Sequence, residues 1–91
     1  MEKNKLVFKC TCRACPEQYD VFYNDKQVAY VRLRHGYLYC DVPDYNGDTI
    51  YEANPQGEGC FWDNEEREYY LNIIKDKIVE YYTRRNRYED L

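Results

Sequence analysis

Three cysteines lie within six positions near the start of the chain, in the stretch FKCTCRACPEQYDVF at residues 8–22. Cys12 and Cys15 have the C-x2-C spacing with which a single turn supplies two thiolate ligands to zinc. A small domain gains much stability from a bound metal. We therefore expect a structural zinc ion held by Cys10, Cys12, Cys15 and Cys60, with no coordination position left open for water.

Two other interpretations of the cysteines remain open. Reduced thiols can pack as small hydrophobic side chains without any metal. A disulfide is less expected, because the chain has five cysteines, an odd number, and begins without an apolar secretory segment. His35 is within reach as a substitute zinc ligand, whereas Cys40 is assigned to the core.

No combination of residues points to catalysis. The one histidine, His35, precedes Gly36 in an expected tight turn, and turn geometry is enough to explain its position. Cys15 and His35 have the residue types of a nucleophile and a base, but no third group is placed to orient the histidine. We therefore expect a protein that is not an enzyme.

The alternation of apolar and polar residues predicts antiparallel strands. The His35-Gly36 turn fixes a register in which Leu33 faces Leu38, Val31 faces Cys40 and Ala29 faces Val42. These residues form an apolar face, and the other face carries Tyr30, Arg32, Arg34, Tyr37, Tyr39 and Asp41. The predicted strands all lie within residues 4–54, over 4–12, 17–24, 27–34, 37–42 and, as a shorter fifth strand, 48–53.

A helix is predicted over residues 63–85. Asp63 can cap its first turn, and Glu66 can reach back from the third helical position to complete a capping box. An apolar stripe recurs at helical spacing along it, formed by Tyr70, Leu71, Ile74, Ile78, Tyr81 and Tyr82. The chain is thus predicted to be a single α+β domain over 1–91, an antiparallel four- to five-stranded meander with one C-terminal helix packed across it and a frayed tail at 86–91.

The negative charge is concentrated in one part of the chain. Residues 41–68 hold nine acids and a single base, Arg67, whereas residues 1–40 hold seven bases and four acids. Acids interleaved with aromatic side chains can complement a basic protein surface, and their field speeds association. The partner-binding residues expected on this basis are Tyr45, Asp48, Tyr51, Glu52, Trp62, Glu65 and Glu66.

The short length, the acidic balance, the twelve tyrosines and the compact α+β plan together resemble small phage or mobile-element anti-defence proteins. Among these, the chain is most similar in overall character to anti-CRISPR inhibitors of Cas9-type nucleases. The resemblance implies a non-enzymatic inhibitor that occupies the basic, nucleic-acid-binding surface of such a nuclease. Because the N-terminal stretch has no apolar secretory segment, we expect a cytoplasmic location, in an infected or host bacterial cell. No motif aligns, so no residue role is transferred.

An alternative function is a small zinc-stabilised nucleic-acid-binding module that uses the face of Tyr30, Arg32 and Tyr39. It is less expected, because the acidic segment at 41–68 repels phosphates. The same tyrosine-rich face could instead support a homodimer. No stretch of the sequence is long and apolar enough to suggest a membrane span.

Overall fold

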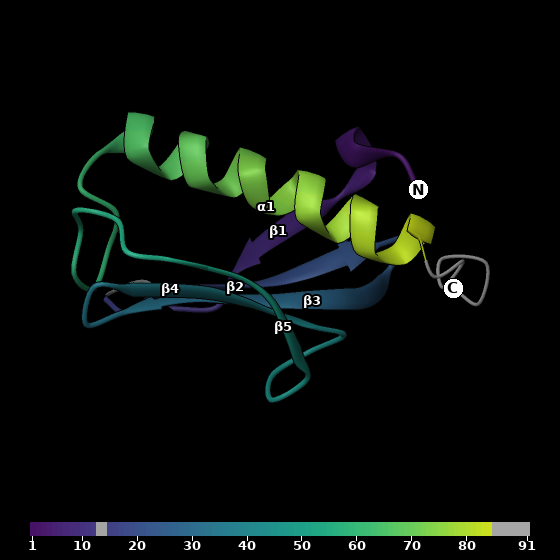
Figure 1. The fold of residues 1–91 in the computed structure, drawn as a ribbon, viewed down its shortest axis with the longest axis horizontal. Helices are drawn as coiled ribbons and strands as arrows, with labels where there is room; N and C mark the ends of the chain where they lie inside the picture. Colours follow the sequence, from purple (N-terminus) through teal and green to yellow (C-terminus); the bar gives the residue numbers. More distant parts are fainter. Residues whose placement is uncertain (13–14, 85–91) are drawn as a thin grey trace.

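The computed structural model describes residues 1–12 and 15–84. In chain order these form a short 3-10 helix η1 (Lys3–Lys5), five strands and one long helix. The remaining elements are β1 (Val7–Cys10), β2 (Glu17–Tyr23), β3 (Lys26–Arg34), β4 (Tyr37–Val42), β5 (Asp48–Ala53) and α1 (Asn64–Arg84). The strands form one antiparallel sheet in the order β1-β2-β3-β4-β5, and α1 lies across one of its faces (Figure 1). The predicted α+β meander with a C-terminal helix is confirmed, while the predicted tail at 86–91 lies outside the described residues.

The turn at His35-Gly36 sets the register at the centre of the sheet. Both residues have positive φ angles, 53° and 73°, the conformation that a two-residue hairpin turn requires. Leu33 therefore pairs with Leu38, as predicted from the sequence. The Val31–Cys40 pair is also confirmed, but the ladder ends at Tyr30 opposite Asp41, one pair short of the expected Ala29–Val42 contact.

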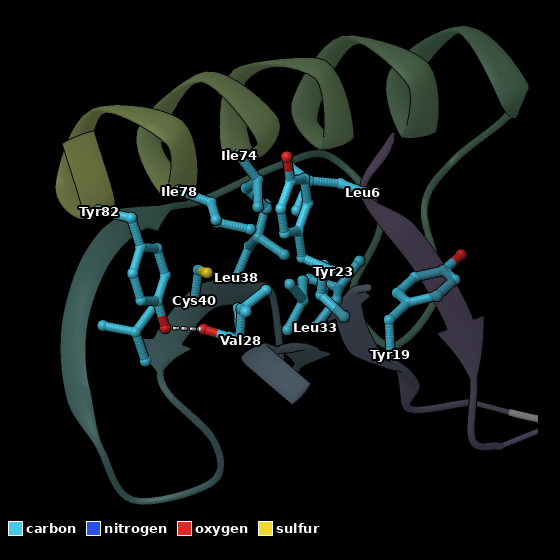
Figure 2. Packing of buried hydrophobic residues seen from close by; sticks show 14 of the residues in the cluster. Leu6, Tyr19, Tyr23, Val28, Leu33, Leu38, Cys40, Ile74, Ile78 and Tyr82 are labelled. Atoms are coloured by element: carbon cyan, nitrogen blue, oxygen red, sulfur yellow. Dashed lines mark hydrogen bonds between the residues drawn. The ribbon is translucent and has the colours of Figure 1, made fainter. Parts of the chain in front are cut away.

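The core lies between α1 and the covered face of the sheet. Leu33 and Leu38 of the central hairpin are almost inaccessible to solvent, and so are Ile74 and Ile78 of α1 (Figure 2). Cys40 lies in the same cluster, as predicted, and burial raises the pKa of its thiol. Of the predicted helical stripe, Ile74, Ile78 and Tyr82 are buried, while Tyr70, Leu71 and Tyr81 are half-buried.

The C-terminal end of α1 is hydrogen-bonded to the sheet where the β2–β3 ladder is irregular. The register shifts between Val21 and Phe22, which leaves Val28 without a partner in β2. The Tyr82 hydroxyl, near the end of α1, donates a hydrogen bond of 2.5 Å to the Val28 carbonyl (Figure 2). This contact anchors the C-terminal end of α1 at the point where the ladder is interrupted.

The first strand is shorter than the predicted 4–12. β1 ends at Cys10, so Cys12 does not continue its alternation of faces. Among residues 1–12 and 15–84, no helix is both long enough and apolar enough to span a membrane.

Candidate functional site

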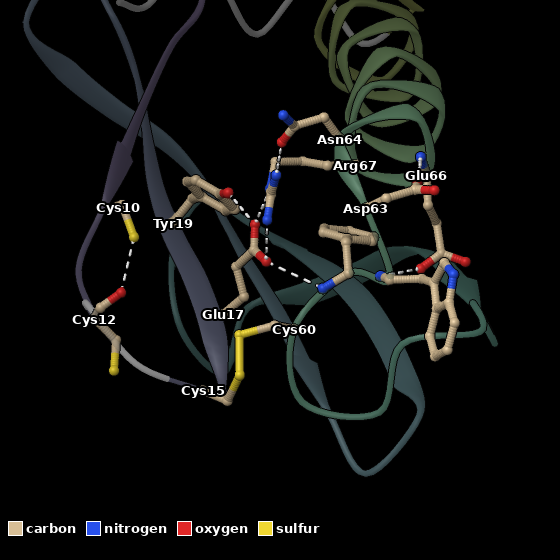
Figure 3. A network of polar contacts seen from close by, with 12 residues as sticks. Cys10, Cys12, Cys15, Glu17, Tyr19, Cys60, Asp63, Asn64, Glu66 and Arg67 are labelled. Atoms are coloured by element: carbon tan, nitrogen blue, oxygen red, sulfur yellow. Dashed lines mark hydrogen bonds and ion pairs between the residues drawn. A yellow bond between two sulfur atoms is a disulfide. The ribbon is translucent and has the colours of Figure 1, made fainter.

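The cysteine cluster forms a disulfide instead of a metal site. Cys15, just before β2, is bonded to Cys60, in the loop before α1, with a Cα–Cα distance of 5.3 Å (Figure 3). The nearby Glu17 amide donates a hydrogen bond of 2.6 Å to the Gly59 carbonyl. The disulfide therefore fastens the start of β2 to a loop already held against it.

The prediction of a zinc ion bound by Cys10, Cys12, Cys15 and Cys60 is wrong. Two of these sulfurs are consumed by the Cys15–Cys60 bond, and a disulfide offers no thiolate. Cys10 and Cys12 are free thiols, and Cys10 Sγ donates to the Cys12 carbonyl at 2.9 Å. Across the described part of the chain, no three His, Cys, Asp or Glu side chains are grouped so as to hold a metal.

The physical reason for this error lies in where the chain turns. Cys15, Cys60 and the His35-Gly36 turn do lie at one end of the sheet, where the Gly36 amide donates to the Glu58 carbonyl at 2.6 Å. A first strand that continued through Cys12, as predicted, would also have directed Cys10 and Cys12 toward that end. Because β1 stops at Cys10, the alternation that aligned these two thiols is lost and Cys60 meets Cys15 alone.

A buried carboxylate next to the disulfide organises this end of the molecule. Glu17 is only 6% exposed. Its carboxylate accepts hydrogen bonds from Arg67 Nε at 2.6 Å and Arg67 Nη2 at 3.2 Å, so the pair is bidentate. The Phe61 amide donates to it at 3.1 Å and the Tyr19 hydroxyl donates as well (Figure 3). Strand β2, the 54–63 loop and α1 thus share one acceptor.

The protonation equilibria follow from these contacts. Burial by itself raises the pKa of Glu17, but hydrogen bonds from Arg67, Tyr19 and the Phe61 amide outweigh it and leave the pKa lowered. The pKa of Tyr19 is raised, first by burial and then by its bond to the Glu17 carboxylate. Glu17 is therefore a charged, fully engaged group whose donors hold it in place, which is a structural role.

This network was not predicted from the sequence, although two signals for it were present. Glu17 has the same parity along β2 as Tyr19 and Val21, so the period of two already placed a carboxylate on the covered face. Arg67 is the only base between residues 41 and 68. A buried acid needs a cationic partner, and Arg67 was the candidate on the adjacent helix.

The start of α1 is capped by a second carboxylate. The Asp63 side chain accepts from the Glu66 amide at 2.9 Å, as predicted. The Glu66 carboxylate, however, accepts from the Trp62 amide at 2.7 Å, and not from the Asp63 amide of a capping box. It also accepts from the amides of Gln56, at 2.8 Å, and Gly57, at 3.1 Å, and these bonds lower its pKa against the opposing effect of desolvation.

The seven expected partner-binding residues lie in different places. Tyr45 packs edge-on against Tyr30 on the face of the sheet away from α1, and Glu52 accepts a hydrogen bond from Tyr37. Tyr51 points to the other side, where it packs on the core beneath α1. The remaining four lie at the start of β5 (Asp48) and around the start of α1 (Trp62, Glu65 and Glu66).

The face of the sheet opposite α1 carries a run of tyrosines in contact. The rings of Tyr37 and Tyr39 are stacked with centroids 5.4 Å apart, and Tyr30 follows Tyr39 at 6.3 Å. Tyr45 continues the run at 5.5 Å from Tyr30, because the loop between β4 and β5 lies on this side (Figure 1). Arg32 pairs across the ladder with Tyr39, and its buried Nε has no hydrogen-bond partner among the described residues.

Within residues 41–68, the exposed charged side chains are all acidic, and bases of α1 lie near some of them, such as Lys77 and Arg84 beside Asp48. The one base of this segment, Arg67, is half-buried against Glu17, so no base of this segment is exposed. Large hydrophobic side chains exposed in the same segment or beside it include Trp62, at 72%, and Tyr45, at 57%. Seven of the nine carboxylates are exposed, namely Asp44, Asp48, Glu52, Glu58, Asp63, Glu65 and Glu68.

The sequence matches no protein family model, and neither a curated protein nor a solved structure matches it.

Proposed function

We propose that this protein is a non-enzymatic binding module whose acidic, aromatic surface contacts a basic surface of a partner protein. The observation that carries the proposal is the environment of Arg67. The only base of residues 41–68 is turned inward to Glu17, while seven carboxylates of that segment remain exposed. A field of one sign over an exposed surface steers a partner of the opposite sign.

Five of the seven expected residues are kept as contacts in this proposal. Tyr45 and Trp62 supply exposed aromatic area, the kind of side chain that dominates binding energy at interfaces. Asp48, Glu52 and Glu65 supply exposed charge. Tyr51 and Glu66 are assigned to the fold instead, because Tyr51 packs on the core and Glu66 caps three backbone amides.

The partner class follows from the chemistry of this surface. A basic groove that holds nucleic acid presents the charges that exposed carboxylates complement, and occupying it excludes the nucleic acid. A Cas9-type nuclease is such a partner, and the module bound to it acts as an inhibitor. We assign no reaction to the chain, since the buried Glu17 is already engaged by Arg67, Tyr19 and the Phe61 amide.

The test is charge reversal on the proposed surface. The variant Asp48→Lys/Glu52→Lys/Glu65→Lys changes three exposed carboxylates and leaves the Glu66 cap intact. Binding to guide-loaded Cas9-type nucleases is measured by biolayer interferometry at physiological salt, and inhibition by DNA cleavage. We expect binding to the nuclease to weaken at least about a hundredfold, since each charge pair lost at an interface costs one or more kcal/mol.

The matched control is Glu2→Lys/Asp76→Lys/Glu80→Lys, which makes the same change in net charge. These three carboxylates are exposed and pair with Lys5, Lys3 and Arg84 in the described part of the chain. Such pairs contribute little to stability, so the control should fold and bind normally. Equal loss of binding in both variants would show that net charge alone controls binding. Full binding by the variant of Asp48, Glu52 and Glu65 would refute the proposal that these carboxylates contact the partner.

A nucleic-acid-binding module is the second candidate, favoured by the stacked rings of Tyr37 and Tyr39 beside Arg32. Aromatic side chains and arginine together form a stacking surface for single strands. A fluorescein-labelled oligothymidine separates the two functions. Binding that persists in low salt, falls steeply as salt rises and is lost in Tyr39→Ala would favour this candidate over the acidic surface.

A further inference from the structure

The outer edge of β1 is a free sheet edge with a defined hydrogen-bonding pattern. Among the described residues β1 pairs only with β2. Just beyond it, the Thr11 amide donates to the Gln18 carbonyl at 3.1 Å, so Thr11 directs its backbone toward β2. Antiparallel pairs alternate between bonded and non-bonded residues. Lys9 therefore also bonds to β2, whereas Phe8 and Cys10 direct their amides and carbonyls outward.

An open hollow adjoins this strand on each face of the sheet. On the side of α1, the hollow is lined by Leu6 and Phe8 together with Leu71 of the helix. On the opposite side, Val7 and Phe22 line a second hollow, and Val7 is 59% exposed. The two hollows share Phe8. Successive side chains of an added strand would point alternately toward one hollow and then the other.

We propose that the β1 edge binds an extended segment of a partner protein, which adds to the sheet as a sixth strand. The segment alternates apolar residues with lysine or arginine. Its main chain bonds to the outward amides and carbonyls of Phe8 and Cys10, and its side chains supply specificity in the two hollows. This site shares Glu65 with the proposed acidic surface, but its main-chain bonds lie on β1, outside residues 41–68, and do not require that surface.

The charges beside α1 favour a basic side chain in that hollow, whereas Lys5 and Lys9 lie with Asp25 in the hollow on the opposite face. Glu65 and Glu68 are exposed on the rim of the hollow beside α1, and the adjacent Arg67 is engaged by Glu17. Lys75 lies over the Phe8 ring, with Nζ 5.7 Å from its centroid. Lysine or arginine entering here places its stem on Leu6 and Leu71 and its cation near the two carboxylates. The apolar residues of the segment then lie against Val7 and Phe22.

A second copy of the chain is a poorer occupant of this edge. The antiparallel register that uses both outward-facing residues of each copy sets Phe8 opposite Cys10. The same register sets Lys9 directly opposite Lys9 of the other copy. Like charges in opposing positions destabilise a strand pair, and an edge lysine is a common means of preventing self-pairing.

The experiment uses two synthetic ten-residue peptides, one alternating valine with lysine and one alternating valine with glutamate. Each is titrated into the isotope-labelled full chain and followed by amide NMR. The lysine peptide should shift the Phe8 and Cys10 amides and protect them from hydrogen exchange. The glutamate peptide should bind at least about tenfold more weakly, because it places like charges beside Glu65 and Glu68.

The decisive variant is Cys10→Pro. A proline here removes an outward amide and no bond to β2, and proline is tolerated on edge strands in this orientation. We expect it to abolish binding of the lysine peptide while its thermal unfolding stays close to that of Cys10→Ser. Cys10→Ser is the matched control, which loses the thiol, keeps the amide and should bind normally.

Three results would overturn the proposal. The first is peptide binding that Cys10→Pro leaves unchanged. The second is the absence of any shift at Phe8 and Cys10 with the lysine peptide at millimolar concentration. The third is a peptide-free dimer, seen by analytical ultracentrifugation, that Cys10→Pro converts to a monomer, since a second copy would then occupy the edge.

Discussion

Arg67 and Glu17 lie fifty residues apart in the chain, and Nε of Arg67 donates to Oε2 of Glu17 at 2.6 Å. The pair joins the first turn of α1 to the beginning of β2. The Arg67 guanidinium also lies 6.0 Å from the centroid of the Phe61 ring, so Arg67 interacts with the 54–63 loop that precedes α1. Arg67 thus stabilises the junction of three segments, and its pairing with Glu17 leaves only carboxylates among the exposed charges of residues 41–68.

Replacing Arg67 with methionine should destabilise the fold strongly. Arg67→Met keeps the apolar stem but leaves the Glu17 carboxylate buried without its cation, which costs about 3 kcal/mol in the free energy of unfolding. Arg84→Met is the matched control, because Arg84 pairs with Glu80 in an exposed position. The control should lose less than about 0.5 kcal/mol. Urea denaturation measures both, and equal losses would contradict a special role for Arg67.

Stability should fall in acid because of Glu17. Its pKa is lowered below the ordinary value of 4.5, so its contribution is complete above that pH and is lost as pH falls through the folded-state pKa. Glu17→Gln should be less stable than the unmodified chain at pH 7, and the difference should shrink between pH 4.5 and pH 2.5. Thermal unfolding at successive pH values measures it. If the difference in stability between the unmodified chain and Glu17→Gln stays constant over this pH range, the ionised Glu17 carboxylate does not stabilise the fold.

The fold was predictable because local signals agreed with one another. The His35-Gly36 turn, the alternation along 37–42 and the Asp63 cap each specify one element, and the chain offers no competing pattern. The predicted bounds of β4 and β5 match the observed ones. The first strand was overextended, since alternation continues through Cys12 in the sequence although β1 ends at Cys10.

Which cysteines react with one another was harder to predict. It depends on the distances between their sulfurs in the folded chain, and the spacing of cysteines along the sequence does not determine those distances. The C-x2-C pattern of Cys12 and Cys15 suits a metal turn, but Cys15 is bonded to Cys60 instead. Nothing in the sequence connects Cys60 to one thiol in preference to three others. Glu66 was likewise assigned to a surface, because the loop that delivers the Gln56 and Gly57 amides to it is irregular.

The disulfide should be measurable directly by its effect on stability. Closing a loop with a sequence separation of 45 residues stabilises the fold by about 4 kcal/mol in the chain-entropy description. Cys15→Ser/Cys60→Ser should therefore unfold at much lower urea concentration, whereas Cys10→Ser should not. The denatured, unreduced protein should react with a thiol reagent at three cysteines and the reduced protein at all five. Five reactive thiols before reduction would contradict the Cys15–Cys60 bond.

Glu66 should contribute more to stability than the Asp63 cap that precedes it. Asp63→Ala removes one acceptor, for the Glu66 amide, and should cost about 1 kcal/mol. Glu66→Ala leaves the amides of Gln56, Gly57 and Trp62 without their acceptor, and should cost about 2–3 kcal/mol because each bond to a charged group is worth more than a neutral one.

Glu65→Ala is the matched control for this comparison, since the neighbouring carboxylate is exposed and should contribute less than about 0.5 kcal/mol. Urea denaturation gives all three values, and amide exchange at Gln56 and Gly57 reports the loop itself. These two amides should exchange faster in Glu66→Ala, because the loop then loses the acceptor that holds it. Equal stability of the Glu65 and Glu66 variants, with unchanged exchange, would return Glu66 to the set of free carboxylates available to a partner.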